Sequence, residues 1–166
     1  MQLNQLPPLS KDRLFNWLKT LSNQLSKGTL IIDVHACELT ILHANNRILQ
    51  LTHYEEEQLI GQGFSILNGT RTHCDTAVDL ISCIKSGEAR KVTILHYTKQ
   101  ESAFWNTITV HPILDDEQVL QYVLLTCEDS TDEVLNKMVY KLEHEVYEAI
   151  DHEDNLQSIL SLIAKK

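Results

Sequence analysis

Three short segments in the second half of the chain alternate apolar and polar residues in a pattern typical of β-strands. Segments 90–98, 103–113 and 120–127 are rich in β-branched and aromatic residues, and polar turns at 99–102 and 114–118 separate them. One face of these strands carries Val92, Ile94, His96, Asn106, Ile108, Val110, Val123, Leu125 and Cys127. The opposite face carries Trp105, Thr107, Thr109, His111, Tyr122, Leu124 and Thr126. Both faces are partly apolar, so we expect both to be covered.

Two further strands are expected upstream. Segments 29–33 and 39–43 are short β-rich runs that predict a hairpin, and short helical pieces interrupted by glycines follow at 45–87. A longer helix is expected at about 74–86. Two strands, several helices and three strands predict an α+β fold with a five-stranded antiparallel sheet and helices on one face. The second face then needs a terminal helix or a second subunit.

Both ends of the chain have helical periodicity. Apolar residues recur at spacings of three and four in 10–26, where Ser10 is the expected N-cap and Gly28 is expected to close the helix. The same spacing recurs in 129–166, where we expect acidic residues 151–154 to interrupt the helix. The expected organisation is an N-terminal amphipathic helix (1–28), a core (29–131) and a C-terminal helical extension (132–166).

The charge distribution excludes some functions. The formal net charge is −9, and ten acidic residues against two lysines lie between positions 128 and 154. The sequence has no basic stripe that could follow a phosphate backbone, so we expect no binding to nucleic acid. For the same reason we expect no binding to an anionic membrane surface. The sequence contains no apolar run long enough to span a bilayer and no signal peptide, which predicts a cytoplasmic protein.

The four cysteines lack metal-ligand spacing and are expected to be small buried apolar residues.

Four motifs resemble one known family. GQGFSILNG at 61–69 and HYTKQESAFWN at 96–106 are similar to GxNCRxLQG and NYxKxGxxFWN of the light-oxygen-voltage (LOV) subfamily of PAS domains, which are blue-light flavoproteins. LTHY at 51–54 and EDST at 128–131 match two further family motifs. The resemblance covers about residues 29 to 131 and implies the PAS version of the expected fold.

The departures from the family pattern bear on function. The photoactive family forms a light-driven bond between a cysteine and its flavin, and Phe64 stands at that position. A phenylalanine has no sulfur, so that bond cannot form there. The resemblance also places family arginines that pair with the flavin phosphate at Ser65 and Ile81, and the loss of these contacts disfavours FMN. Arg47 or Arg71 are candidate substitutes.

The resemblance implies five cavity positions: Phe64, Asn68, His96, Asn106 and Cys127. Asn106 matches a family amide, whereas His96 and Cys127 replace amide side chains of the flavin site. One interpretation is a remodelled small-ligand site with a pH-sensitive histidine, and the other is a closed core with internally bonded polar residues. The cofactor is therefore unknown, with FMN possible but disfavoured.

The second candidate region is an interface. Its expected members are Trp105, Thr107, Tyr122, Leu124, Leu135 and Leu142. The sheet residues among them could equally form ordinary core beneath a terminal helix. His144, Glu148 and His152 share one helical face at metal-ligand spacing, but acidic surface helices often carry such residues by chance, and no metal site is predicted.

The sequence therefore predicts a sensory or signal-relay module rather than an enzyme. It contains none of the common catalytic motifs and no recognisable kinase, cyclase or DNA-binding segment. We expect its output to pass through an effector protein or through homodimerisation. The alternatives are a sensor that binds a flavin or another small ligand, an enzyme using His96 with Cys127 or a bound cofactor, and a purely structural adaptor with a filled core.

Overall fold

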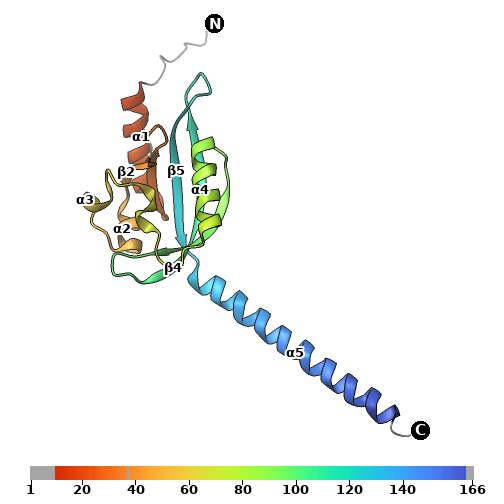
Figure 1. The fold of residues 1–166 in the computed structure, drawn as a ribbon. Coiled ribbons are helices and arrows are strands. Elements are labelled where there is room, and N and C mark those ends of the chain that lie inside the picture. Colours follow the sequence, from red (N-terminus) through yellow and green to blue (C-terminus); the bar gives the residue numbers. More distant parts are fainter. Residues whose placement is uncertain (1–9, 37, 164–166) are drawn as a thin grey trace. The chain divides into compact units, whose positions relative to one another are not determined.

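A computed structural model describes the backbone of residues 10–36 and 38–163, and the side chains of these residues up to Glu148. Its centre is an antiparallel sheet of five strands in the order β2-β1-β5-β4-β3 (Figure 1). The strands are β1 (Gly28–Asp33), β2 (Thr40–Ala44), β3 (Lys91–Tyr97), β4 (Ala103–Leu114) and β5 (Leu120–Asp129). The predicted α+β fold with a five-stranded antiparallel sheet is confirmed.

One face of the sheet, called the inner face below, packs against the short helices between β2 and β3. These are α2 (Asn46–Thr52), α3 (Glu56–Leu59), the 3-10 helix η1 (Phe64–Leu67) and α4 (Cys74–Ser86), whose axis runs roughly along β5 in Figure 1. Fully buried Leu30, Ile108 and Leu125 from the strands meet Ile48 and Leu67 from the helices in the main core cluster. The alternation of apolar residues predicted this face correctly.

The opposite, outer face is covered over part of its width by α1 (Lys11–Gln24). Leu18 of α1 packs against Ile31, Tyr122 and Leu124 and is only 1% exposed. A terminal helix therefore supplies the second cover that the apolar pattern required, over strands β1 and β5.

The end of α1 differs from the prediction. The helix ends at Gln24, Leu25 is extended, and Gly28 is the first residue of β1 rather than a helix-closing glycine. Gly28 is needed for close packing, because a Cβ there would lie 3.1–3.3 Å from atoms of Ile48 and the Cys127 carbonyl oxygen. Ser10 occupies the N-cap position but makes no side-chain capping bond.

Asn45 fixes the junction between α1, β1 and α2. Its Oδ1 accepts hydrogen bonds from the backbone N–H groups of Thr29 (2.9 Å) and Ile48 (3.1 Å). Its Nδ2 donates to the carbonyl oxygens of Ser22 and Lys27, both at 2.9 Å. One N-cap side chain thus holds the end of α1 and the start of β1 against the first turn of α2.

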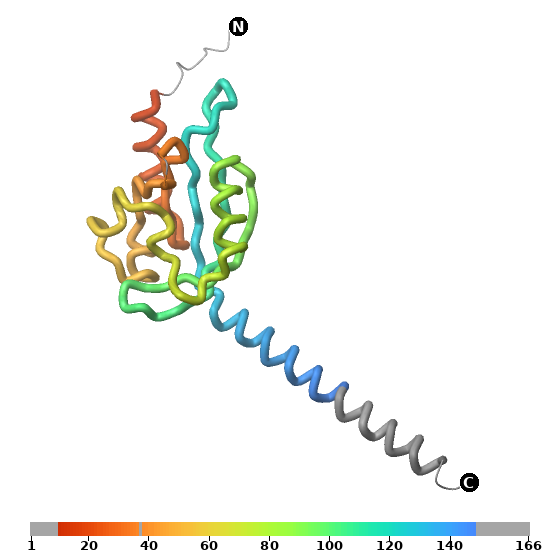
Figure 2. Tube along the Cα trace, in the orientation of Figure 1, coloured from red at the N-terminus to blue at the C-terminus, as the bar shows by residue number. Residues whose placement is uncertain are grey.

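The chain divides into two compact units, one up to Ser130 and one from Thr131 onward. The second unit is the helix α5 (Thr131–Ile163), shown in blue in Figure 1 and partly grey in Figure 2. The predicted interruption at 151–154 is wrong, because α5 continues through these residues. The segment contains no glycine or proline, and aspartate alone costs a helix only a few tenths of a kcal/mol per residue (roughly 0.7 at most).

The cysteines differ in their surroundings. Cys83 and Cys127 are buried as predicted, whereas Cys74 is exposed in the first turn of α4, which corrects the expectation for that residue. Cys37 lies outside the described residues. No described helix is long and apolar enough to cross a membrane.

Candidate functional site

Three polar or sulfur-containing side chains of the inner face converge from neighbouring strands. His96 on β3, Asn106 on β4 and Cys127 on β5 are each at most 1% exposed. Asn106 Nδ2 donates to His96 Nδ1 at 3.2 Å. This leaves the ring proton on His96 Nε2, and neither Nε2 nor Asn106 Oδ1 has a hydrogen-bond partner among the described residues.

Burial controls the ionisation of this group. Loss of hydration lowers the pKa of His96 to about 4, so the imidazole is neutral at physiological pH. Burial raises the pKa of the Cys127 thiol to about 12, against a smaller opposite effect of its hydrogen bond with Asn106. A neutral thiol is a weak nucleophile, and a neutral imidazole with so low a pKa is a weak base. The pair is poorly suited to catalysis.

Phe64 closes the space in front of these residues. It is the first residue of η1, is 3% exposed and belongs to the main core cluster. Its ring lies edge-on to His96 with 5.7 Å between ring centroids, and His96 makes a similar contact with Phe104 at 6.4 Å. The sequence placed Phe64 in the cavity, and in the structure its side chain is part of the wall.

The space that remains beside Phe64 is small. A pocket of about 190 Å³ is lined by Glu38, Leu39, Phe64, Ser65, Ile81 and Lys85. Ligand pockets usually enclose roughly 300–1,000 Å³, so this one is below the common range. His96, Asn106 and Cys127 do not line it. Lys85 is a cation at this pocket that the sequence interpretation missed, because no family motif marks it.

The comparisons with known proteins agree with this architecture. A family model described as a PAS domain matches residues 26–132. The chain belongs to the PAS domain family. PAS domains are sensory modules, which places the chain among signalling proteins.

The similarity extends to LOV proteins, as the motifs predicted. The chain is 28% identical over 117 residues to phototropin-2 of Oryza sativa subsp. japonica, covering 70% of this chain and 13% of the relative. It is 27% identical over 143 residues to blue-light-activated histidine kinase 1 of Erythrobacter litoralis, covering 86% of this chain and 40% of the relative. The chain thus spans less than half the length of either relative.

A solved structure, described as an RNA-binding light-oxygen-voltage receptor, has a similar fold. Its TM-score is 0.69 at 21% sequence identity, and the match covers 86% of this chain and 42% of that one. At this identity the match shows the fold alone.

The other candidate flavin contacts are Asn68 and the two suggested arginines. Asn68 is half-buried at the C-cap of η1, and among the described residues no hydrogen bond joins its side chain to His96, Asn106 or Cys127. The suggested arginine substitutes do not line the pocket beside Phe64. Arg47 lines a pocket beside α1 and α2, and Arg71 lines one beside Trp105.

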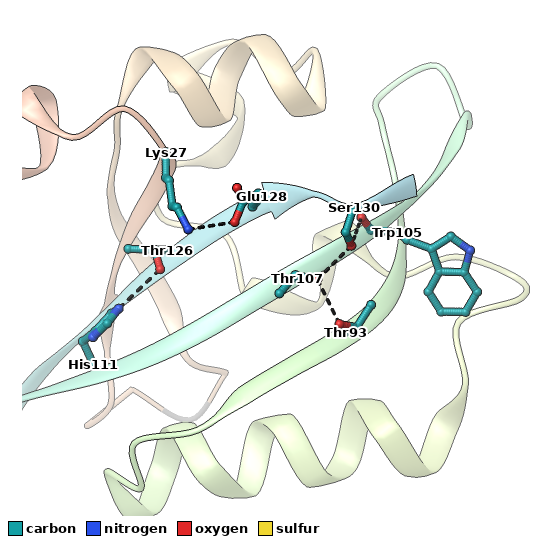
Figure 3. Close-up of polar contacts among 8 residues, drawn as sticks. All are labelled: Lys27, Thr93, Trp105, Thr107, His111, Thr126, Glu128 and Ser130. Carbon is teal, nitrogen blue, oxygen red and sulfur yellow. Dashed lines mark hydrogen bonds and ion pairs between the residues drawn. The ribbon is translucent and has the colours of Figure 1, made fainter. Parts of the chain in front are cut away.

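The outer face carries a chain of hydroxyl groups that joins β3, β4 and Ser130, the residue after β5 (Figure 3). Thr107 Oγ1 shares hydrogen bonds with Thr93 Oγ1 (2.9 Å) and with Ser130 Oγ (2.7 Å). Ser130 Oγ also donates to the Trp105 carbonyl oxygen at 3.1 Å. Ser130 directly precedes α5 in the chain, so these bonds tie β3 and β4 to the residue just before α5.

The predicted interface residues of the sheet fall into two groups. Tyr122 and Leu124 are 6% and 7% exposed beneath α1. At these two positions the structure therefore agrees with the interpretation of core residues beneath a terminal helix. Trp105 is half-buried beyond the area covered by α1, and Figure 3 shows its indole ring extending away from the strand. Trp105 and Leu95 line a pocket of about 270 Å³ with Arg71, His73 and Thr93. Thr107 is 8% exposed and is held by the hydroxyl chain.

Leu135 and Leu142 belong to an apolar stripe along α5. They are 48% and 61% exposed, and Met138, Val139 and Val146 are similarly exposed. His144 Nε2 lies 3.3 Å from Glu148 Oε1, but the side chain of His152 lies outside the described residues. Among the described side chains no group of three is suited to hold a metal ion.

Proposed function

We propose that this PAS domain relays a signal through protein contacts made by the open part of its outer sheet face and by α5, without a cysteine–flavin photocycle. The observation that carries the proposal is the packing of Phe64. Its ring occupies core space against His96, and the pocket left beside it is only about 190 Å³. Phe64 also supplies no sulfur at the position where the related photoreceptors carry their reactive cysteine.

Exposed apolar surface supports the proposed output. Trp105 and Leu95 on the outer face, and the stripe of Leu135, Met138 and Leu142 on α5, offer aromatic and aliphatic anchors of the kind enriched in interfaces. The partner is a second copy of the chain or an effector protein. A change in sheet packing would alter the hydroxyl chain that ends at Ser130 and so bias the packing of α5. Non-enzymatic action and a cytoplasmic location are part of the proposal.

Sedimentation velocity of the full chain tests the interface. Trp105→Asp and Leu142→Asp should each weaken self-association or effector binding by about 30-fold, the factor that roughly 2 kcal/mol at a central anchor represents. Val78→Asp is the matched control, because Val78 is a 66% exposed apolar residue on α4. If neither variant weakens self-association or effector binding, these surfaces are not the interface. Leu124→Asp is unsuitable because it places a carboxylate beneath α1.

A ligand sensor is the second candidate, and one observation favours it. His96 Nε2 is a buried donor and Asn106 Oδ1 a buried acceptor, and both lack partners among the described residues. A small polar ligand or a water molecule that reached them would supply the missing hydrogen bonds. An absorption spectrum and native mass spectrometry of the purified protein separate the candidates. A colourless protein whose mass equals that calculated from the sequence supports relay through protein contacts. A bound flavin or other organic molecule supports the ligand sensor.

Light provides the sharper test of the photocycle. Phe64→Cys restores the sulfur but not the arginines at positions 65 and 81, so we expect no flavin uptake and no light-driven bleaching after incubation with FMN. The wild-type chain treated in the same way should also remain colourless. Reversible bleaching of the wild-type chain would overturn the proposal.

A further inference from the structure

A large pocket lies at the junction of α1 with the core, and its lining includes none of His96, Asn106 and Cys127. It encloses about 850 Å³ between the end of α1, the linker to β1, the end of β2 and helices α2 and α3, which gather at one edge of the sheet in Figure 2. Its lining includes Lys19, Asn23, His43, Arg47, Gln50 and Glu56. Side-chain amides and charged groups dominate this wall, whereas half of the lining beside Phe64 is apolar (Leu39, Phe64 and Ile81).

A buried histidine forms part of the wall. His43 is 4% exposed, and neither of its ring nitrogens has a hydrogen-bond partner among the described residues. The nearest charged atom recorded for it is Glu56 Oε1, which lies 4.0 Å from Nδ1. Burial lowers the pKa of His43, and Lys19 lowers it further against the opposite effect of Glu56. Lys19 lines the same pocket as His43.

The lining carries a local excess of positive charge in an acidic chain. Lys19 and Arg47 stand against the single carboxylate of Glu56, whereas the whole chain has a net charge of −9. Neither cation forms an ion pair with another described residue. By contrast, the pocket between α1 and the β4–β5 turn has Arg13 against three acidic residues. Lys19 Nζ lies over the Phe15 ring, 6.0 Å from its centroid. Two cations without a described carboxylate partner beside a polar cavity favour an anion.

The walls are held in place by Asn45, which also lines the pocket. Its four hydrogen bonds join the end of α1, the start of β1 and the first turn of α2. A site whose walls are fixed before binding loses less entropy when a ligand arrives. Its position also means that a ligand would bridge α1 and the core.

We propose that this pocket binds a small organic anion that carries a carboxylate or phosphate group together with hydroxyl or amide groups. Lys19 and Arg47 would pair with the anionic group, and Asn23, Gln50 and Glu56 would bind the polar remainder. His43 would supply a ring N–H that now lacks an acceptor. The site is separate from the group of His96, Asn106 and Cys127, and it does not depend on the proposed relay. His43 is the strand partner of Ile31 on the outer face, whereas His96 lies on the inner face.

Titration of the full ¹⁵N-labelled chain with citrate and, separately, with inorganic phosphate tests the proposal. We expect saturable shifts confined to residues 19–26, 43–50 and 56, including the ring nitrogens of His43. Binding of citrate alone identifies a carboxylate ligand, binding of phosphate alone identifies a phosphate ligand, and binding of both shows a general oxyanion site. Absence of saturable shifts with either anion would overturn the proposal.

Charge-removing variants locate the site. Lys19→Gln and Arg47→Gln should each weaken binding by at least about tenfold, as expected for loss of one charge-assisted contact. Lys99→Gln and Arg71→Gln are the matched controls, since neither residue lines this pocket. Circular dichroism checks that every variant is folded. Equal weakening by the controls would indicate nonspecific attraction to positive charge and would also overturn the proposal.

Discussion

The two faces of the sheet are built from the same strands but are completed differently. On the inner face, helices α2 to α4 and Phe64 bury every core residue, including His96 and Asn106. On the outer face, α1 covers Ile31, Tyr122 and Leu124, while Trp105 and its neighbours on β3 and β4 are only partly covered. The comparison suggests that substitutions on the inner face act mainly on folding, and those on the open outer face mainly on association.

The polar groups of the two faces differ in the same way. On the inner face, His96 and Asn106 share one hydrogen bond and each keeps an atom without a described partner. On the outer face, Thr93, Thr107 and Ser130 form a connected chain of hydroxyl bonds. Buried polar groups without hydrogen-bond partners destabilise the folded state, whereas hydrogen-bonded networks stabilise it. The inner polar pair is therefore a cost that the surrounding apolar packing must offset.

The largest contrast should come from truncating one aromatic residue on each face. Phe64→Ala should lower the free energy of unfolding by about 3–5 kcal/mol, because it removes a buried core ring and leaves a cavity. Trp105→Ala should cost about 1 kcal/mol, because the indole is only partly covered. Urea denaturation followed by circular dichroism measures both. If the two losses are equal, the inner face is not the tightly packed one.

A smaller but diagnostic effect should follow from the buried imidazole. Because the folded pKa of His96 is about 4 and the unfolded value about 6.5, only the unfolded chain binds this proton between those pH values. Stability should therefore fall as the pH drops from 6.5 to 4, by about 3 kcal/mol in total from this group. His43, whose pKa is also lowered, contributes in the same direction.

Urea denaturation at several pH values measures the contribution of His96. His96→Asn retains an amide partner for Asn106 and should remove most of the fall between pH 6.5 and 4. His111→Asn, which replaces an exposed ring on the outer face, should keep the wild-type pH dependence. An unchanged pH profile in His96→Asn would show that its ring is hydrated in the folded protein.

The fold could be predicted from the sequence because its signals are local. Alternation in β3 to β5, turn residues and helical spacing depend on neighbouring residues, and they identified the strands, their faces and the need for a second cover. The end of α1 was missed because Gly28 is required by packing against Ile48, which is distant in sequence. The continuity of α5 was missed because the acidic cluster was weighed above the absence of glycine and proline.

The candidate site was only partly predictable. The strand register places His96, Asn106 and Cys127 on one face, which alternation alone indicates. That Tyr122 and Leu124 lie beneath α1 while Trp105 does not depends on which strands α1 crosses, and no local pattern specifies this. The pocket around His43 was not predicted, because Lys19, His43 and Arg47 come from three elements and form no motif.

A third prediction tests the hydroxyl chain of the outer face. Thr107→Val keeps the shape of the side chain but removes its bonds to Thr93 and Ser130, and should cost about 1–2 kcal/mol. Thr109→Val is the matched control, since Thr109 lies on the same face of β4 with no described side-chain hydrogen bond, and should change stability by less than about 0.5 kcal/mol. Urea denaturation measures both variants, and equal losses would show that the chain adds no stability.

The smallest effect should come from the ion pair at the rim of the outer face. Lys27 Nζ lies 2.7 Å from Glu128 Oε2, and both side chains are 50% exposed (Figure 3). Exposed pairs contribute little, so a double-mutant cycle with Lys27→Met and Glu128→Gln should give a coupling of about 0.5 kcal/mol that decreases in high salt. A coupling above about 2 kcal/mol would mean that this rim is shielded from water in solution. Because the isolated chain leaves it exposed, that shielding would have to come from a partner, and the outer face would then be an occupied interface rather than an open one.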